Sequence, residues 1–391
     1  MALSRREFLR CCGAIAAAFG IGVSEAAPGE RGMAGSAPHE KTTSVHGRIL
    51  RTHESAYARL KARGSQYSCH AENREQWQAW REQFHRDLVR ELGPNPGEVP
   101  LRPEVLERTD QGDYLREKVI FDSEPFMSVP AWVLTPKGIA PGERRPGVLC
   151  GHGHGHGKNG VVGLGPDGQP QEDYNHAIAV HLVRQGYVTI APDWRGFGER
   201  ADSEEWIPRE WVDCEKSCDI IYLTVGYFGF HMLNLELWDG RKTLDYLLTR
   251  KEVDPARLGC IGCSFGGTMA TYLSALDERI KVAVICCYMS TLDDALGFRR
   301  TPGYCGVQYM PGLAKYGDIS DVATLIAPRP LMVQSGERDT CFVKEDATVA
   351  AQRVQRAYQV IGEAEKFEFD LFPGVHEIDV PAAVHWFRRW L

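Results

Sequence analysis

The sequence has no excess of basic residues. Its 45 lysines and arginines are outnumbered by 52 aspartates and glutamates, which gives a formal net charge of −7 at pH 7. Binding to nucleic acid or to an anionic lipid surface depends on a surplus of positive charge. We therefore expect no nucleic-acid partner.

Glycine, proline and cysteine are also limited in number. The chain has 40 glycines, 22 prolines and 12 cysteines in 391 residues. Disordered or fibrous chains carry roughly 25–30% Gly plus Pro, and disulfide scaffolds carry more than about 8–10% Cys. The cysteines do not form two pairs at zinc-ligand spacing. With 43% hydrophobic residues, the composition indicates a globular protein whose cysteines pack as small apolar side chains.

The longest apolar run covers only residues 11–23. A membrane-spanning helix needs about 20 residues. The run follows the pair Arg5-Arg6 and precedes the small residues Ser24 and Ala26, as in a cleavable export signal. We expect a twin-arginine signal peptide over residues 1–26, recognition by the twin-arginine export machinery, a periplasmic or secreted protein, and no stable membrane anchor.

The remaining chain divides where its composition changes. Residues 27–45 are rich in Gly, Ala, Ser and Pro and are expected to be a linker. Residues 46–114 are expected to form an N-terminal helical appendage, and residues 115–391 the main domain. Within the appendage, apolar residues at spacings of three and four indicate an amphipathic helix. They are Trp77, Trp80, Phe84, Leu88 and Leu92.

Short apolar runs alternate with helical patterns from about residue 115. Strands are expected at 119–122, 129–135, 147–150, 188–191, 258–262, 282–286, 331–334 and 367–372. Helices are expected near 174–185, 232–250, 265–276, 343–362 and 379–391. The first two strands should form an antiparallel pair. The alternation predicts an α/β fold with a mostly parallel central sheet and helices on both faces. Ligands of such sheets bind at the carboxyl ends of the strands.

A Gly-x-Ser-x-Gly motif stands between an expected strand and an expected helix. It runs from Gly262 to Gly266 with Ser264 at its centre. In this context the serine hydroxyl is lifted above the sheet, and the next backbone N–H, that of Phe265, points towards the reacting carbonyl. We expect Ser264 to be a nucleophile and Cys263 to pack into the sheet.

From about residue 115 the chain resembles the α/β-hydrolase superfamily, within it the dienelactone-hydrolase and acetyl-xylan-esterase-like branch. Besides the serine motif, the matching segments are Asp193–Gly198, Asp239–Leu247, Ala327–Pro330 and His376-Glu377. The chain departs from those esterases at Phe197 and Phe265, where they carry Gln. The resemblance implies an α/β-hydrolase fold whose catalytic residues follow in the order serine, acid, histidine.

The acid and the histidine are expected in the loops that follow the last two expected strands. Asp339 is expected to orient the histidine and to stabilise the imidazolium ion. Glu337 competes for this role, but it lies closer to the strand, and the resemblance favours Asp339. His376 is expected to be the general base, whereas His385 lies inside the terminal helix.

Glycines and histidines alternate over residues 151–158. The resemblance places an oxyanion donor after the first His-Gly pair of this segment. The donors would then be the backbone N–H groups of His154 and Phe265. Alternatively, the imidazoles of His152, His154 and His156 would hold zinc.

Some other segments near the expected site allow more than one interpretation. Arg195 either has an electrostatic or positioning role beside the site or pairs structurally with Asp193 or a nearby backbone carbonyl. Aromatic residues crowd the segment 206–230, which fits a lid, a sugar-facing wall or core packing. A segment after the strand at 282–286 is expected to roof the pocket, and it contains Cys305, Tyr309 and Tyr316.

The residues therefore predict an exported serine carboxylic-ester hydrolase that works through an acyl-enzyme without a cofactor. The expected substrates are acetyl or other small esters, including esters of carbohydrates. Three alternatives remain open. They are a peptidase or lactone hydrolase on the same fold, a zinc hydrolase that uses the histidine loop, and a non-catalytic polysaccharide-binding protein.

Overall fold

The computed structural model describes residues 44–45, 48–49, 51–63, 68–202, 214–293 and 304–391. The expected signal peptide and nearly all of the expected linker lie outside the described residues. The chain divides into two units, residues 1–51 and 52–391. In the first unit, β1 (Ser44–Val45) pairs with β2 (Arg48–Ile49) in antiparallel orientation.

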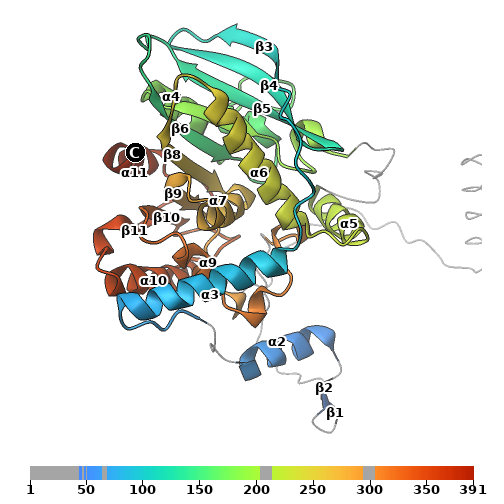
Figure 1. Cartoon of the computed structure of the whole chain (residues 1–391). Coiled ribbons are helices and arrows are strands. Elements are labelled where there is room, and N and C mark those ends of the chain that lie inside the picture. The colour runs from blue at the N-terminus through green and yellow to red at the C-terminus, as the bar shows by residue number, and fades with distance from the viewer. Residues whose placement is uncertain (1–43, 46–47, 50, 64–67, 203–213, 294–303) are drawn as a thin grey trace, which may run out of the picture. The chain divides into compact units, whose positions relative to one another are not determined.

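The second unit is built on a nine-stranded sheet in the order β11-β10-β9-β8-β6-β7-β5-β4-β3 (Figure 1). The pairs from β11 through β7 are parallel, and β5, β4 and β3 extend the sheet with antiparallel pairs. The strands are β3 (Glu104–Asp110), β4 (Tyr114–Glu124), β5 (Met127–Pro136), β6 (Arg145–Gly151), β7 (Val188–Pro192), β8 (Val253–Cys263), β9 (Ile280–Cys286), β10 (Leu331–Gly336) and β11 (Phe367–Phe372). This confirms the expected mostly parallel sheet, including its antiparallel pair.

Both faces of the central part of the sheet are covered, which explains why strands such as β6, β7 and β10 are continuous apolar runs. Along β6, Leu149 belongs to one hydrophobic cluster, while its neighbours Val148 and Cys150 belong to the cluster on the opposite face. All three side chains are fully buried. Successive side chains of a strand point to opposite faces, so only an uninterrupted apolar sequence fills both clusters.

Helices form the two outer layers. One cluster contains residues of α4 and α11, and the other contains residues of α3, α6, α7, α9 and α10 (Figure 1). These helices are α3 (Arg74–Leu92), α4 (Ile178–Arg184), α6 (Met232–Thr249), α7 (Phe265–Leu276), α9 (Ile319–Thr324), α10 (Lys344–Val360) and α11 (Val380–Trp390). Two more helices are α2 (Thr52–Arg63) and α5 (Cys214–Gly226). Each helix expected after residue 115 is present, while α5 and α9 were not expected.

The expected N-terminal appendage is only partly helical. The apolar stripe forms α3, in which Trp77, Phe84 and Leu88 are buried. Residues 104–110, however, form β3 at the edge of the central sheet, so the expected boundary at residue 114 is wrong. Six of the seven residues of β3 are exposed, and an edge strand of this kind shows no apolar alternation.

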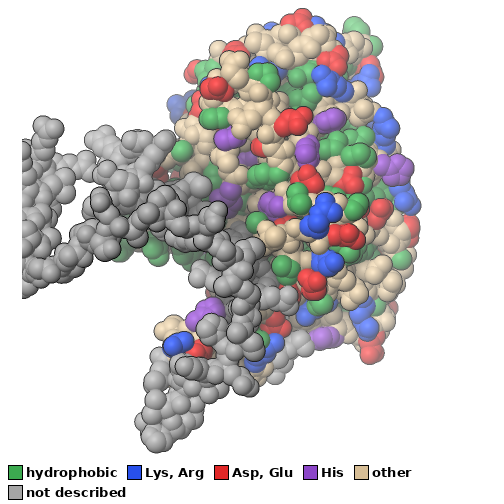
Figure 2. Space-filling model, turned by 180° about the vertical axis from the view of Figure 1, so that it is seen from behind, with side chains coloured by type: hydrophobic (Ala, Val, Ile, Leu, Met, Phe, Trp, Pro, Cys, Tyr) green, Lys and Arg blue, Asp and Glu red, His purple; other side chains and the backbone are tan. Residues whose placement is uncertain are grey.

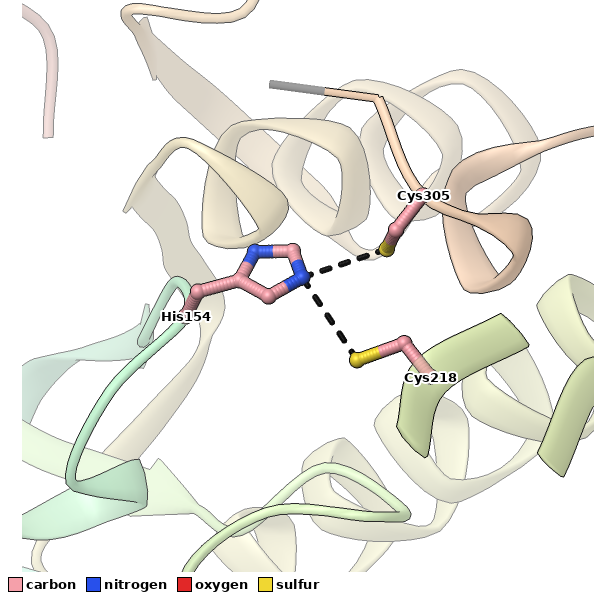
Figure 3. Close-up of side chains that lie close together, drawn as sticks. All are labelled: His154, Cys218 and Cys305. Carbon is pink, nitrogen blue, oxygen red and sulfur yellow. Dashed lines mark hydrogen bonds between the residues drawn. The ribbon is translucent and has the colours of Figure 1, made fainter. Parts of the chain in front are cut away.

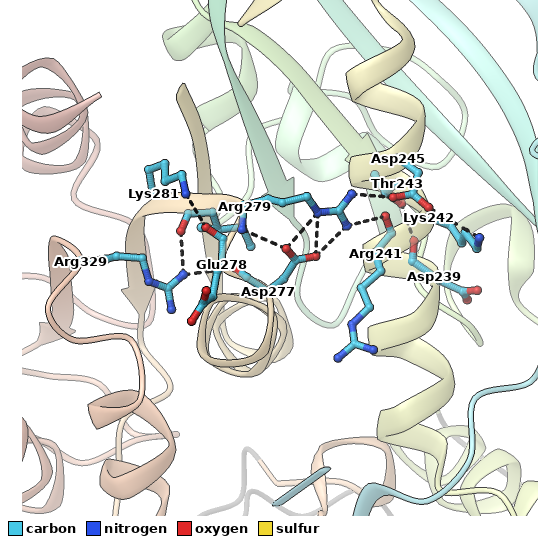
Figure 4. Close-up of polar contacts among 11 residues, drawn as sticks. Asp239, Arg241, Lys242, Thr243, Asp245, Asp277, Glu278, Arg279, Lys281 and Arg329 are labelled. Carbon is cyan, nitrogen blue, oxygen red and sulfur yellow. Dashed lines mark hydrogen bonds and ion pairs between the residues drawn. The ribbon is translucent and has the colours of Figure 1, made fainter. Parts of the chain in front are cut away.

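Two arginines close the turn between α7 and β9 (Figure 4). The guanidinium of Arg279 binds Asp277 at 2.7 Å and Asp245 of α6 at 2.5 Å. Arg329 donates to the carbonyl oxygens of Ser274 at 2.5 Å and Ile280 at 2.7 Å. These contacts give the motif residues Asp245 and Arg329 a structural role.

The visible face in Figure 2 carries acidic and basic side chains in a mixed pattern, without a continuous field of one sign. Within the described ranges, every helix falls short of the length and hydropathy required to cross a membrane.

Candidate active site

Ser264 occupies the tight turn between β8 and α7. Its backbone has φ 61° and ψ −121°, a region that residues other than glycine rarely adopt. Its N–H donates to the carbonyl oxygen of Cys286 at 3.0 Å, and its own carbonyl accepts from the N–H of Thr268 at 3.0 Å. Strain of this kind persists only where the surroundings enforce it, and it is concentrated at functional sites.

Glycines around the serine let three backbone segments meet. A Cβ on Gly266 would collide with the carbonyl oxygen of Gly151, at the end of β6. A Cβ on Gly262 would collide with the carbonyl oxygen of Gly266. The serine turn and the loop after β6 are therefore in direct contact, which only glycine permits at these positions.

The loops after β10 and β11 bring Asp339 and His376 together. Nδ1 of His376 lies 2.9 Å from Oδ2 of Asp339. The other carboxylate oxygen accepts the N–H groups of Cys341 at 2.7 Å and Phe342 at 3.1 Å. Because a carboxylate only accepts, Nδ1 carries the proton and Nε2 is left as the basic nitrogen.

The electrostatic environment keeps Asp339 ionised. Burial by itself would raise the pKa of this carboxyl, but the hydrogen bond to His376, the charge of His376 and the two backbone donors outweigh burial. The pKa of Asp339 therefore lies below its ordinary value.

Two aromatic rings flank His376. Phe342 stacks on it at 5.8 Å between ring centroids, and Tyr174 lies at 5.5 Å. The hydroxyl of Tyr174 also donates to the carbonyl oxygen of His154 at 2.6 Å. A Cβ on Gly153 would contact both this hydroxyl and Cβ of Ser264. Tyr174 therefore links His376 to the loop that lies against the serine.

The two expected oxyanion donors lie on two elements near the serine. His154 belongs to the loop after β6, and Phe265 is the first residue of α7. A Cβ on Gly153 would lie 2.8 Å from Cβ of Ser264, so the residue before His154 abuts the expected nucleophile. The role of both N–H groups as oxyanion donors remains a prediction.

His152 does not act as a metal ligand in this structure, because its ring nitrogens are both engaged. Nε2 accepts the N–H of Trp194 at 3.0 Å, and Nδ1 lies 2.7 Å from the carbonyl oxygen of Gly153. Burial lowers the pKa of His152 to about 4, despite the nearby charge of Asp193. The ring is therefore neutral and serves to hold two loops together.

The expected alternative of zinc on three alternating histidines is not supported. His156 bonds instead to the side chain of Gln171 at 3.1 Å. In the part of the chain that the structure describes, two groups of potential metal ligands converge, and neither contains His152 or His156. The loop continues into the 3-10 helix η1 (Gly157–Val162), and its three histidines contact different partners.

Arg195 lies in a buried network of carboxylates. Its guanidinium binds both oxygens of Asp239 at 2.7 and 2.9 Å, and it reaches Glu124 at 2.6 Å. The expected pairing with Asp193 is wrong, since Asp193 binds Lys158 at 2.7 Å. With its side chain 9% exposed, Arg195 ties the loop after β7 to α6.

The segment after β9 lines a cavity of about 200 Å³. Its wall is rich in tyrosine, with Tyr272, Tyr288, Tyr304 and Tyr309 among the lining residues. Tyr304 packs on Phe342 at 5.4 Å between ring centroids, which connects the cavity wall to the ring that flanks His376. Tyr316 instead contacts Glu91 of α3 through its hydroxyl, so it packs against that helix.

The structure describes only part of the aromatic segment 206–230, which was expected to form a lid, a sugar-facing wall or core. Tyr227 and Phe228, just after α5, are 92% and 77% exposed and belong to no core. Tyr222 packs against the main cluster. Residues 203–213 lie outside the described residues, and Trp206 and Trp211 are among them.

Sequence reasoning missed Tyr174 and Phe342. Phe342 follows Asp339 by only three residues, so its proximity to the acid is a local signal that could have been used. Tyr174 lies before α4, 202 positions from His376 in the sequence, and still contacts the His376 ring. No motif marks it.

A model of the Abhydrolase family matches residues 40–378 of the chain. The chain is also 28% identical, over 326 residues, to the "Putative hydrolase YtaP" of Bacillus subtilis (strain 168). That alignment covers 80% of this chain and 100% of the relative.

Solved structures share the fold at low sequence identity. A "putative acetyl xylan esterase" from Bacteroides fragilis NCTC 9343 has a TM-score of 0.68 and 21% identity, covering 85% of this chain and 84% of that one. A glucuronoyl esterase from Solibacter usitatus has a TM-score of 0.56 and 17% identity, covering 81% of this chain and 93% of that one. At these identities the likeness concerns the architecture alone.

Proposed function

The chain belongs to the Abhydrolase family, and from this premise we propose that it is a serine hydrolase that cleaves carboxylic esters through an acyl-enzyme. The observation that carries the proposal is the 2.9 Å contact between His376 and Asp339, together with a serine held at φ 61°. Tyr174 and Gly153 connect this serine to His376. This combination of an oriented base and a strained, glycine-flanked serine is the arrangement that nucleophilic catalysis by serine requires.

In the proposed reaction, Oγ of Ser264 attacks the ester carbonyl carbon while Nε2 of His376 takes its proton. The carbonyl oxygen becomes an oxyanion that accepts hydrogen bonds from the N–H groups of His154 and Phe265. Collapse of the intermediate expels the alcohol, which receives the proton from His376, and leaves an acyl group on Ser264. Water, deprotonated by His376, then releases the acid and restores the serine.

The ionised Asp339 supports both proton transfers. Its negative charge stabilises the imidazolium ion that forms each time His376 takes a proton. Its hydrogen bond also fixes Nδ1 as the protonated nitrogen, which keeps Nε2 available to the serine and later to water. The rings of Tyr174 and Phe342 restrict the imidazole to the plane in which these contacts are made.

We propose acetyl or other small esters of carbohydrates as the substrates. The tyrosine-lined cavity beside Phe342 supports this proposal, because aromatic rings pack on the apolar faces of sugar rings while hydroxyl groups offer hydrogen bonds. The fold shared with an acetyl xylan esterase and a glucuronoyl esterase is consistent with this substrate class. A screen of acetylated glycans against p-nitrophenyl esters would identify the acyl group and the alcohol.

The proposal also includes export. Cleavage of a twin-arginine signal after Ala26 is supported by the pair Arg5-Arg6 and by the small residues Ser24 and Ala26. N-terminal sequencing of the protein from the culture medium or periplasm should begin at Ala27. An Arg5→Lys, Arg6→Lys double variant should stay in the cytoplasm, and secretion of that variant at the normal level would contradict this part.

A serine-reactive phosphonate followed by mass mapping tests the central claim. The label should appear on the peptide that contains Ser264, and Ser264→Ala should lose both the label and ester turnover while keeping its circular dichroism spectrum. Cys263→Ala is the matched control, because Cys263 adjoins the nucleophile but is fully buried. Turnover that survives in Ser264→Ala and disappears in Cys263→Ala would refute the assignment.

A further inference from the structure

Three potential metal ligands converge beside the proposed active site. Nε2 of His154 lies 3.1 Å from Sγ of Cys305 and 3.6 Å from Sγ of Cys218 (Figure 3). All three ligand atoms lie within 4.8 Å of one another. They come from the loop after β6, from α5 and from the residue that caps the 3-10 helix η3 (Gly306–Gln308). Residues from such different parts of the chain meet here only because of the fold.

The spacing of these atoms fits one small cation. Zinc binds thiolate sulfur at about 2.3 Å and imidazole nitrogen at about 2.0–2.1 Å in a tetrahedral arrangement, so a sulfur and a nitrogen on one zinc lie roughly 3.6 Å apart. The contact of His154 with Cys218 equals this separation, and the contact with Cys305 is shorter by half an ångström. A small outward shift of the Cys305 side chain would bring the second nitrogen–sulfur distance to the same value.

The elements that carry the ligands are held in place by other contacts. Oδ1 of Asp219, the residue after Cys218, accepts the N–H of Gly306, the residue after Cys305, at 2.6 Å. The edge of the Phe197 ring meets the ring of His154 at 5.2 Å between centroids. Contacts of this kind fix the ligands before a metal arrives, as the outer partners of metal sites do.

We propose that His154, Cys218 and Cys305 form a zinc site. Two sulfur donors and one imidazole are the donor set of thiophilic ions, whereas magnesium and calcium require oxygen ligands. Cys218 and Cys305 are 1% and 8% exposed, which protects bound metal from exchange. Within the described residues the group has three members, so the fourth coordination position is left to water.

The site would control the position of the oxyanion loop, and this consequence rests on the proposed function. The side chain of His154 would bind zinc while its backbone N–H faces the reacting carbonyl. Zinc would thereby tie the loop after β6 to α5 and η3, the two elements that bring the thiols. The hydroxyl of Tyr174 already restrains the same residue through its carbonyl oxygen. In this role zinc orders the loop and takes no part in breaking the ester bond.

Zinc binding by the mature chain, purified without a polyhistidine tag and under reducing conditions, tests the proposal. After dialysis against zinc, mass spectrometry of the metal content should give one zinc per chain. Zinc should also raise the thermal unfolding midpoint, because it binds only the folded state. Cys218→Ser and Cys305→Ser should each weaken binding by more than about tenfold, the lower end of the loss seen even for outer partners of metal sites. Both should also lose the rise in midpoint.

Cys69→Ser is the matched control, since Cys69 lies outside the cluster and is partly buried. It should bind zinc as the parent does. If Cys218→Ser does not fold, Cys305→Ser decides the question, because serine can keep the capping contact that Cys305 makes in η3.

Three results would overturn the zinc site. They are less than half an equivalent of bound zinc in the parent, unchanged binding in both serine variants, and a disulfide between Cys218 and Cys305 in the protein as isolated. The outcome is distinct from that for the ester hydrolase, which depends on phosphonate labelling of Ser264. Labelling of metal-free Cys305→Ser would support the serine proposal whatever the result with zinc.

Discussion

Asp339 allows the proposed mechanism to be tested by replacing one oxygen atom of its carboxylate with an amide nitrogen. Asp339→Asn keeps the size of the side chain but can donate to Nδ1 of His376, which favours the wrong tautomer. We expect kcat to fall by about 10⁴-fold, the loss found when the orienting acid of a serine triad is converted to its amide. The unfolding midpoint should change little by comparison. A variant within tenfold of the parent would show that Asp339 does not orient the base.

The pH dependence of turnover follows from the same pair. The pKa of Asp339 is held below its ordinary value by His376 and two backbone donors, so this carboxylate stays ionised above about pH 5. The imidazole of His376 must be neutral to accept the serine proton. We therefore expect kcat/KM to rise with pH on the acid side of its profile and then to level off. A profile without an acid limb over the pH range in which the protein stays folded would contradict the role of His376.

Glu236 gives a prediction for stability instead of catalysis. Burial raises the pKa of this carboxyl from 4.5 to about 8, although Arg195 and Arg200 oppose the shift. Between these two values the folded state holds a proton that the unfolded state has released. The contribution of Glu236 to the free energy of unfolding is therefore full at low pH and is lost as pH rises towards 8.

The neutral variant Glu236→Gln removes this loss. Relative to the parent, its free energy of unfolding should improve by about 2 kcal/mol between pH 6 and pH 8. Urea denaturation at the two pH values measures the change. Asp239→Asn is the comparison, because the pKa of Asp239 is lowered by its arginine partners despite burial, and no such gain on raising the pH is expected there. Parallel pH profiles for Glu236→Gln and the parent would rule out a protonated Glu236.

The residues of the site differ in how far the sequence reveals them. Ser264, Asp339 and His376 remain predictions, but each follows a strand in the order that a hydrolase requires, and the structure brings the acid and the histidine into contact. Tyr174 and the cysteine partners of His154 could not be anticipated. Cys218 and Cys305 lie 64 and 151 positions from His154 in the chain, and contacts over such separations leave no local pattern.

Among the elements, the turn from β8 to α7 is the least tolerant of change. A Cβ on Gly266 would collide with the backbone of Gly151, which cannot move without displacing β6. Gly266→Ala should therefore cost about 1–3 kcal/mol of stability, as overpacking usually does. Because the collision also moves Ser264, the loss of turnover should exceed the loss of folded protein.

Gly226→Ala is the control for this substitution, since a Cβ at Gly226 meets nothing within 4 Å. It should change the unfolding free energy by no more than about 1 kcal/mol. Urea denaturation and ester turnover, measured for both variants, separate local strain from the general effect of replacing glycine. Full activity in Gly266→Ala would show that the backbone segments have more room than the structure gives them.

Secondary structure was predictable where burial on both sides left a continuous apolar sequence. Strands β6, β7, β9 and β10 were anticipated for this reason. The first residues of β8 were not, because residues 254–257 of this strand lie at its exposed end. Strand β3 was not predicted because its sequence is largely polar, and α9 was not predicted because it has only six residues. Elements such as these are set by their neighbours in the fold, and their own sequences carry little information.

For the whole molecule, the zinc site and the serine chemistry predict separate responses to a chelator. Prolonged treatment should lower ester turnover without abolishing it, because zinc orders the loop that carries His154 but no bond-breaking step of the proposed reaction uses the metal. It should lower the unfolding midpoint, by roughly 2–4 °C for each kcal/mol of lost binding energy. Calorimetry and turnover of the same sample provide the measurement. Turnover that is abolished by the chelator and restored by zinc would favour a zinc hydrolase.

Nine strands also leave two outer edges, and their composition bears on self-association. On β3 the acidic residues Glu104, Glu107 and Asp110 stand at one edge of the sheet. At the other edge β11 carries Glu368 and Asp370. An unpaired edge is a template on which another chain can add a strand, and charged side chains on the edge discourage such addition. The one basic residue of β3, Arg108, pairs with Glu117 of β4. A second copy that approached either edge with its own would bring carboxylates against carboxylates, so the sheet can grow to this width without recruiting its neighbours into an aggregate.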